Sequence, residues 1–194
     1  FLAYCAGLAQ GDLGRSMKTG APVLAEIGRR LPATLELAVL ATLAAIALGV
    51  PLGIASALRP NSAFDHAVRV VSLIGVSMPA FLLALLLQLL FGIWLGWLPI
   101  SGRNSPFFID DPVTGFAVLD GLLLGDFEAA WDAAAHLVLP VAVLAAFLAA
   151  TLGRFVRNAL REVLMQDYVR TARSKGLPER DVILVHALRN ALLP

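Results

Sequence analysis

Residues 35–58 read LELAVLATLAAIALGVPLGIASAL, and Glu36, at the edge of this stretch, is its one ionisable side chain. A helix needs about 20 predominantly apolar residues to cross the hydrocarbon core of a bilayer, so the stretch is long and apolar enough. Pro32 suits the first turn of a helix, and the acidic Glu36 is tolerated near the positive end of the helix dipole. We therefore predict a transmembrane helix over 35–58.

The composition of the whole chain also favours a membrane protein. Of its 194 residues, 59% are hydrophobic and 15% are charged, and the mean hydropathy is +0.81. Soluble domains usually contain about 45–50% apolar and about 25% charged residues. The single cysteine, Cys5, rules out a disulfide framework and a cysteine-based zinc site within the chain.

Two further stretches predict transmembrane helices, over 70–98 and 136–153. The first is longer than a straight helix needs to cross the bilayer, so it must tilt, kink or protrude, and Pro79 is the expected kink. Trp94 and Trp97 lie near its end, where aromatic rings favour the headgroup layer. The stretch 136–153 is near the lower length limit, and a core helix of a soluble protein is the alternative. The fold class we predict is an all-α, polytopic transmembrane bundle.

The loop charges predict the orientation, because basic loops stay in the cytoplasm. Arg103 is the one basic residue between 99 and 135, where acids dominate, whereas 154–192 is rich in arginine. We expect 99–135 to be external, and 154–192 and the short loop 59–69 to be cytoplasmic. Residues 1–34 would then be external, although Arg15, Lys18, Arg29 and Arg30 argue the other way. An external start requires a preceding helix, so we interpret the sequence as the middle of a longer membrane subunit.

Small residues four apart let helices approach closely in a bilayer. Gly49 with Gly53, and Gly92 with Gly96, are two such pairs. We expect both pairs to pack against neighbouring helices or a second subunit rather than to form a specific glycine dimer.

Polar side chains are rare inside the predicted spans. Ser77 and Gln88 are candidates to line a translocation path, because polar groups in lipid tend to face a cavity. A bond from the serine hydroxyl to its own helix is the alternative. No Asp, Glu or Lys lies deep in a predicted span, which argues against a proton-driven pump built on a buried carboxylate.

The segment after the third span predicts two helices joined by a glycine. Residues 157–175 carry an apolar stripe at helical spacing, and Gly176 follows as a helix-terminating glycine. Pro178 suits the first turn of a second, amphipathic helix over about 178–192. This helix–glycine–helix elbow offers a partly charged face to a partner. A basic helix that rests on anionic lipid headgroups is the alternative.

The order of residues in this segment resembles a known loop. DYVRTARSKGL at 167–177, followed by HALRNALLP at 186–194, resembles the cytoplasmic EAA-type loop of ABC importer permeases, above all the dipeptide, oligopeptide and nickel branch. GDLGRS, RLPATLELA, GVPLGI and GWLPISGR match that branch in order over nearly the whole chain. Of the general Glu-Ala-Ala and Gly pattern only Ala172 and Gly176 agree, and Gly176 lies farther from LLP than usual, which favours the peptide branch.

The resemblance implies a six-span subunit of the bacterial inner membrane, of which this chain would hold spans two to four. The elbow would place a coupling helix in a groove of a cytoplasmic ATP-binding subunit. Segments 1–34 and 99–135 would face an external substrate-binding protein, and a second related permease would complete the path. Dipeptides, oligopeptides, nickel chelates and glutathione remain open as substrates. The implied ATPase-coupling positions are Arg170, Thr171, Ala172, Arg173, Gly176, Leu177, Glu179 and Arg180, with Arg170 and Arg173 meeting acids of the partner.

We expect no enzyme activity, metal or nucleic acid for this chain. GDLGRSMKTG lacks the glycine that a phosphate-binding loop needs before its lysine, and GVSMP lacks the last glycine of a GxSxG elbow. His66, His136 and His186 are far apart in sequence. ATP and magnesium would therefore be bound by a partner. The alternatives are a secondary transporter or channel with a site at the membrane midplane, and an intramembrane enzyme.

Overall fold

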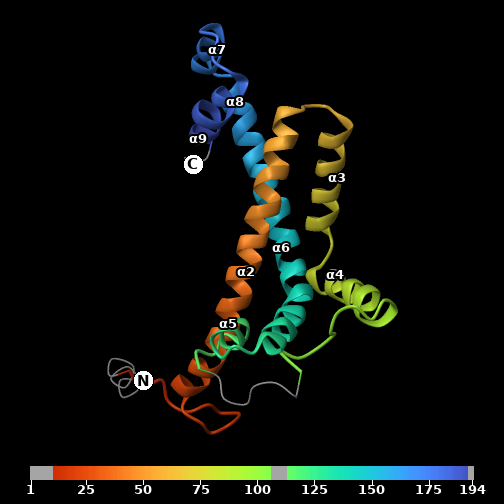
Figure 1. The fold of residues 1–194 in the computed structure, drawn as a ribbon, viewed down its shortest axis with the longest axis vertical. Helices are drawn as coiled ribbons and strands as arrows, with labels where there is room; N and C mark the ends of the chain where they lie inside the picture. The colour runs from red at the N-terminus through yellow and green to blue at the C-terminus, as the bar shows by residue number, and fades with distance from the viewer. Residues whose placement is uncertain (1–10, 106–112, 192–194) are drawn as a thin grey trace. The chain divides into compact units, whose positions relative to one another are not determined.

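The computed structural model describes residues 11–105 and 113–191, and this part of the chain is helical, as the sequence predicts (Figure 1). Its one β feature is an isolated bridge between Arg15 and Pro22. Cys5 lies outside the described residues. The elements are α2 (Val23–Leu58), α3 (Ala63–Ser77), α4 (Ala80–Leu87), the π-helix η1 (Gln88–Trp94), α5 (Ala117–Leu123), α6 (Phe127–Leu164), α7 (Asp167–Ser174), α8 (Glu179–Asp181), the π-helix η2 (Val182–Ala187) and α9 (Leu188–Ala191).

Two helices, α2 and α6, are each long and apolar enough to cross a membrane. Taken together, α3 and α4–η1 are also long and apolar enough to cross a membrane, although the pair is bent by 105°. The described chain therefore holds two candidate spans, or three if the bent pair is one span.

The helices extend beyond the predicted apolar stretches. α2 begins at Val23, so Pro32 and Glu36 lie in its interior rather than in its first turn. α3 begins at Ala63, and therefore much of the loop expected over 59–69 is helical. α6 begins at Phe127 rather than near His136. Hydropathy marks only the part of a helix that matches the bilayer core, and helical hydrogen bonding continues past it.

The expected kink at Pro79 is a break between two helices. Met78 is extended, with φ −81° and ψ 131°, and Pro79 is the N-cap of α4. Proline disfavours helical geometry in the residue before it and lacks the N–H that would continue the helix. The chain therefore turns at Met78–Pro79 before α4 starts.

Gly92 and Gly96 do not form the packing pair on one helix that their spacing predicts. Gly92 lies within η1, but Gly96 follows the end of that helix with φ +62°. This left-handed conformation favours glycine, so Gly96 ends the helix, and the two residues do not share a helix face. Trp97, just beyond, packs on Phe91 with ring centroids 6.0 Å apart.

The chain divides into two compact units. The first unit contains Phe1–Val39 and Leu98–Val138. Within it, the Glu36 carboxylate accepts hydrogen bonds from the Arg103 guanidinium at 2.9 Å and from the backbone N–H groups of Ala117 at 3.1 Å and Val118 at 3.0 Å. Glu36 thereby ties α2 to Arg103 and to the first turn of α5.

Two further carboxylates organise the same unit. Asp120 is buried, which raises its pKa, but hydrogen bonds from Thr114 and Gly115 outweigh this and hold the pKa below its ordinary value. Asp132 accepts hydrogen bonds from the backbone N–H and the hydroxyl of Ser105 at 2.6 and 2.7 Å. In the described part of 99–135, Asp120 and Asp132 therefore fix the loop by accepting hydrogen bonds from residues of the same segment.

The second unit contains Leu40–Trp97 and Leu139–Pro194. In it α2 and α6 lie in direct backbone contact. A Cβ atom on Gly49 would lie 2.8 Å from the carbonyl oxygen of Ala149, and one on Gly53 would lie 2.6 Å from that of Gly153. Such an approach is possible only without side chains, so Gly49 and Gly53 set the distance between these helices.

Candidate functional site

The elbow consists of α7, a turn, and the helical segment from α8 to α9. Gly176, in the turn, has φ +74°, a conformation that favours glycine, and Pro178 is the N-cap of α8. The single helix expected over 157–175 is in fact two helices. α6 ends at Leu164, and Gln166 is extended with φ −72° and ψ 149° before α7 begins. The first arm of the elbow is therefore a short helix separate from α6.

A small apolar core holds the elbow together. Val169 and Val182 are fully buried and pack with Ala172, which is 7% exposed, against Val163 and Leu164. Ala172 therefore faces the inside of the elbow. The coupling role expected for Ala172 stays a prediction, and in this structure a partner could touch its side chain only if the elbow opened.

Arg173 and Glu179 join the two arms of the elbow across the turn. Arg173 donates hydrogen bonds to the Glu179 carboxylate from Nη2 at 2.6 Å and from Nε at 3.1 Å. These bonds lower the pKa of Glu179 and raise that of Arg173. In this structure the guanidinium of Arg173 pairs with an acid of its own chain, and its expected contact with acids of an ATP-binding subunit stays a prediction.

The outer surface of the elbow carries the remaining predicted coupling residues, since Arg170, Thr171, Leu177 and Arg180 are exposed. Arg170 lies 3.6 Å from Asp167, but the two side chains are 71% and 97% exposed. Such exposed pairs contribute little, so Arg170 is available to other acids. This surface combines positive charge with an exposed leucine.

The second arm of the elbow is seated on the ends of two long helices. Ala187 and Ala191 are buried against Ala57 of α2 and Leu160 of α6. The Asn190 side-chain amide also donates a hydrogen bond to the Tyr168 hydroxyl at 3.1 Å, which links the two arms. The elbow, the end of α2 and the end of α6 are therefore packed together.

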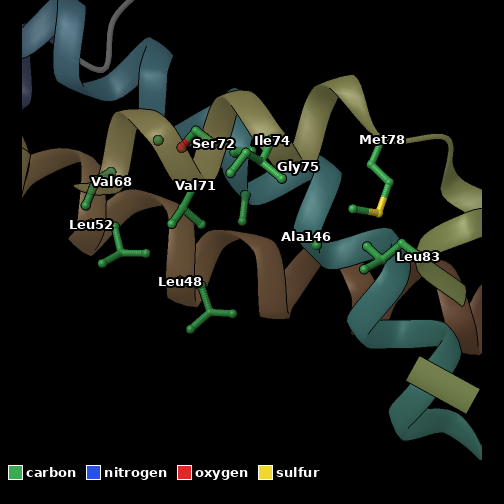
Figure 2. A pocket seen from close by; sticks show the side chains of 13 residues that line it. Leu48, Leu52, Val68, Val71, Ser72, Ile74, Gly75, Met78, Leu83 and Ala146 are labelled. Atoms are coloured by element: carbon green, nitrogen blue, oxygen red, sulfur yellow. The ribbon is translucent and has the colours of Figure 1, made fainter. Parts of the chain in front are cut away.

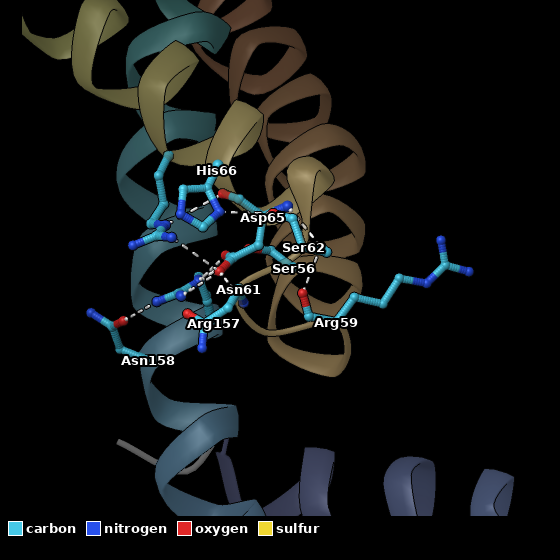
Figure 3. Close-up of polar contacts among 9 residues, drawn as sticks. Ser56, Arg59, Asn61, Ser62, Asp65, His66, Arg157 and Asn158 are labelled. Atoms are coloured by element: carbon cyan, nitrogen blue, oxygen red, sulfur yellow. Dashed lines mark hydrogen bonds and ion pairs between the residues drawn. The ribbon is translucent and has the colours of Figure 1, made fainter.

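A charged cluster that the sequence does not predict lies near the contact between the elbow and the ends of α2 and α6 (Figure 3). Asp65 in the first turn of α3 is fully buried and binds Arg157 of α6, with Nε 2.7 Å from Oδ1 and Nη2 2.9 Å from Oδ2. The Ser56 hydroxyl of α2 donates a hydrogen bond to the same Oδ1, and Arg157 Nε also donates to the Ser56 hydroxyl oxygen at 3.1 Å. Three helices thus meet at one buried ion pair, which we call the ionic cluster (Ser56, Asp65 and Arg157).

Local bonds place Asp65 for this contact. Its carboxylate accepts a hydrogen bond from the Asn61 N–H at 3.1 Å, and its own N–H donates to the Ser62 hydroxyl, the N-cap of α3. Arg69 approaches Oδ2 at 3.4 Å from one turn further along α3. Ser62 three residues before Asp65 is a helix-start pattern, and it could have predicted that α3 begins here.

An apolar cavity of about 390 Å³ lies between α2, α3, α6 and the start of α4 (Figure 2). Its lining is apolar or glycine except for Ser72. Ser77 and Gln88, the residues expected to line a path, are not part of it: Ser77 is exposed at the end of α3, and Gln88 is half-buried at the start of η1. In the described part of the chain, no group of three or more His, Cys, Asp or Glu side chains could hold a metal ion.

Long apolar helices, a bent helix pair and an elbow seated on helix ends define the chain as a multi-pass helical membrane protein. Residues 49–194 match the family described as binding-protein-dependent transport system inner membrane component, and the chain belongs to that family. These residues include the ionic cluster and the whole elbow.

Curated relatives match over the full chain. It is 47% identical to the di/tripeptide transport system permease protein DppB of Pseudomonas aeruginosa, and 44% identical to the dipeptide transport system permease protein DppB of Escherichia coli, in each case over 100% of this chain and 58% of the relative. The oligopeptide transport system permease protein AppB of Bacillus subtilis is 37% identical over 100% of this chain and 56% of the relative. The chain therefore spans somewhat more than half the length of these relatives.

Proposed function

We propose that this chain is part of a permease subunit of an ATP-driven importer for dipeptides or oligopeptides. The membership of the family and the peptide permeases among its relatives support this substrate class. The observation that carries this proposal is the folded elbow. Val169, Ala172 and Val182 fill its inside, while Arg170, Leu177 and Arg180 are exposed on its outer surface. Cytoplasmic subunits would bind ATP and magnesium, since the sequence of this chain has no phosphate-binding loop.

The outer face of the elbow is the proposed contact with the ATP-binding subunit. Leu177 would enter an apolar groove of the partner, while Arg170 and Arg180 would meet acids at its rim. Because Val169, Ala172 and Val182 close the inside of the elbow, it would move as one body when the ATP-binding subunits close. The permease would then shift between two packed states, one open to each side of the membrane.

The orientation proposed from the loop charges completes the assembly. Segments 1–34 and 99–135 would face an external binding protein that delivers the peptide, while 59–69 and 154–192 would face the cytoplasm. A second, related permease would supply the other half of the path. A secondary transporter whose basic elbow rests on lipid is the alternative, and it needs no ATP-binding partner.

The elbow contact is tested by co-purification of the full-length permease with its ATP-binding subunits. Leu177→Asp and Arg180→Glu should each reduce recovery of the ATP-binding subunits at least tenfold, because each places an acid in the proposed interface. Arg189→Glu, an equal charge change at an exposed position of α9, is the matched control and should recover them as the wild type does. Equal recovery with all three variants would remove the proposal in favour of the lipid-resting elbow.

A further inference from the structure

α3 is anchored at one end by the ionic cluster. Asp65 lies in the first turn of α3 and is held by Arg157 through two parallel hydrogen bonds and by the Ser56 hydroxyl. A bidentate pair fixes direction as well as distance, because the planar guanidinium must lie in the plane of the carboxylate. This end of α3 cannot slide along α6 without breaking two charged hydrogen bonds in a buried place.

The far half of α3, residues 71–77, carries no charged side chain and so has no such ion pair. Val71, Leu73, Ile74 and Val76 are 42–67% exposed within this chain. The apolar cavity lies between this half, α2 and α6, and Val71, Ile74 and Gly75 are among its lining residues (Figure 2). Dispersion contacts across an apolar surface have no fixed direction, so this half can shift without losing a specific bond.

The anchored end lies close to the elbow. Arg157 is one turn before Leu160 on α6, and Leu160 is buried against Ala187 and Ala191 of the elbow. On α2, Ser56 is next to Ala57, which packs on the same two alanines. A force that moves the elbow therefore acts on the two helices that hold Asp65.

We propose that the ionic cluster is the pivot through which movement of the elbow swings α3 and, beyond the bend at Pro79, α4. Charged side chains in membrane helices are expensive to bury, which favours a working role for a pair that three helices share. Arg157 and Asp65 are positioning residues in this scheme and touch no substrate. The inference rests on the proposed function, because it needs an ATP-binding subunit to move the elbow.

The first test measures coupling in the full-length permease assembled with its second permease, ATP-binding subunits and binding protein in liposomes. Asp65→Asn and Arg157→Met should lower the peptide imported per ATP hydrolysed about tenfold, while ATP hydrolysis itself stays within about twofold. The exchanged pair, Asp65→Arg with Arg157→Asp, should recover at least half of the ratio. Arg154→Met, one turn away on α6 and exposed, is the matched control and should keep the wild-type ratio.

A residue that only stabilises the fold gives a different pattern. Substituting such a residue would lower the yield of the assembled complex. It would reduce peptide import and ATP hydrolysis in parallel, so the peptide imported per ATP hydrolysed would stay unchanged. An unchanged ratio in assembled Asp65→Asn or Arg157→Met would therefore overturn the pivot.

The second test uses wild-type residues in the pivot, so it does not depend on a variant that folds poorly. Spin labels at Phe64 and Phe155 would report the anchored end, and labels at Val76 and Leu148 the free end; all four side chains are exposed. On ATP binding the first distance should change by no more than about 2 Å and the second by about 5 Å, the range of helix shifts in switching proteins. Equal changes at both ends, or none at Val76, would overturn the pivot.

The two proposals fail in different ways. If the wild type imports no peptide when ATP is supplied, the proposed function is wrong. If the wild type is coupled and Asp65→Asn is coupled equally well, the proposed function stands and only the pivot is wrong.

Discussion

The backbone of Gly53 in α2 lies against the backbone of Gly153 in α6, so closely that a Cβ atom on Gly53 would be 2.6 Å from the Gly153 carbonyl oxygen. Real Cβ atoms essentially never approach backbone oxygen at that distance. Because the obstacle is backbone rather than a flexible side chain, a larger residue can be accepted only if the two helices move apart.

Gly53→Ala should therefore destabilise the protein by about 1–3 kcal/mol, the usual effect of overpacking a close contact. The measurement is thermal unfolding of the purified protein in detergent. Gly28→Ala is the matched control, because Gly28 lies in the same helix and a Cβ atom there meets nothing within 4 Å. Alanine is also the better helix former, so this control should be neutral or slightly stabilising. Equal melting temperatures for the two variants would contradict the close approach.

Acid should loosen the elbow. Hydrogen bonds from Arg173 lower the pKa of Glu179, so the pair stabilises the elbow fully above the pKa of an unpaired glutamate, and this contribution is lost as the pH falls through the lowered folded value. Glu179→Gln should therefore increase proteolytic cleavage between 167 and 181 at neutral pH, with the difference from the wild type disappearing in acid.

Two controls belong to this measurement. Glu162→Gln removes an exposed acid just before the elbow and should change cleavage little at any pH. High salt should shrink the effect of Glu179→Gln, because both partners of the pair are partly exposed and screened. A difference that persists unchanged in acid would show that the pairing with Arg173 is not its cause.

The sequence predicts the fold class, a bend at Pro79 and the turn at Gly176, because each depends on local chemistry, although the bend at Pro79 is a full break between two helices. Apolar length marks the spans, proline breaks a helix, and glycine adopts the left-handed conformation. The spacing of Gly49 and Gly53 predicts a close helix contact, and the structure shows that their partner is α6. The assignment of inside and outside, and the roles of Ser77 and Gln88, stay predictions.

The ionic cluster could not be predicted, because its partners are far apart in the chain. The sequence predicts a loop around Asp65 and a basic surface helix around Arg157, where each would be an ordinary solvated charge. Only the packing of α2, α3 and α6 brings them together and excludes water. Ala172 is a similar case, since its small side chain gives no sign that Val169 and Val182 enclose it.

Ala172→Glu should open the elbow rather than merely weaken a surface contact. Ala172 packs with the apolar Val169 and Val182, and a buried polar group without a hydrogen bond costs about 1–3 kcal/mol. Hydrogen exchange of α7 and α8 should rise at least tenfold in the purified protein, without any ATP-binding subunit present. Thr171→Glu, at the exposed neighbour, is the control and should leave exchange unchanged. Protection retained in Ala172→Glu would place residue 172 on the surface after all.

Glu36→Gln should release α5 from α2. The carboxylate of Glu36 accepts three hydrogen bonds, from Arg103 and from the N–H groups of Ala117 and Val118. A glutamine side chain has only one acceptor oxygen. Its NH₂ group would face at least one of the N–H donors that the carboxylate now accepts from. Hydrogen bonds to a charged group contribute about 1.5–3 kcal/mol, and we expect a loss of that order in unfolding free energy.

The measurement is hydrogen exchange of the backbone amides in α5, with the thermal unfolding of the whole protein beside it. In Glu36→Gln the amides of Ala117 and Val118 should lose protection first, because they are the donors that lose their acceptor. Glu128→Gln, an exposed acid in the first turn of α6, is the matched control. If α5 stays equally protected in both variants, other contacts hold this helix, and the buried carboxylate of Glu36 is not what fixes its position.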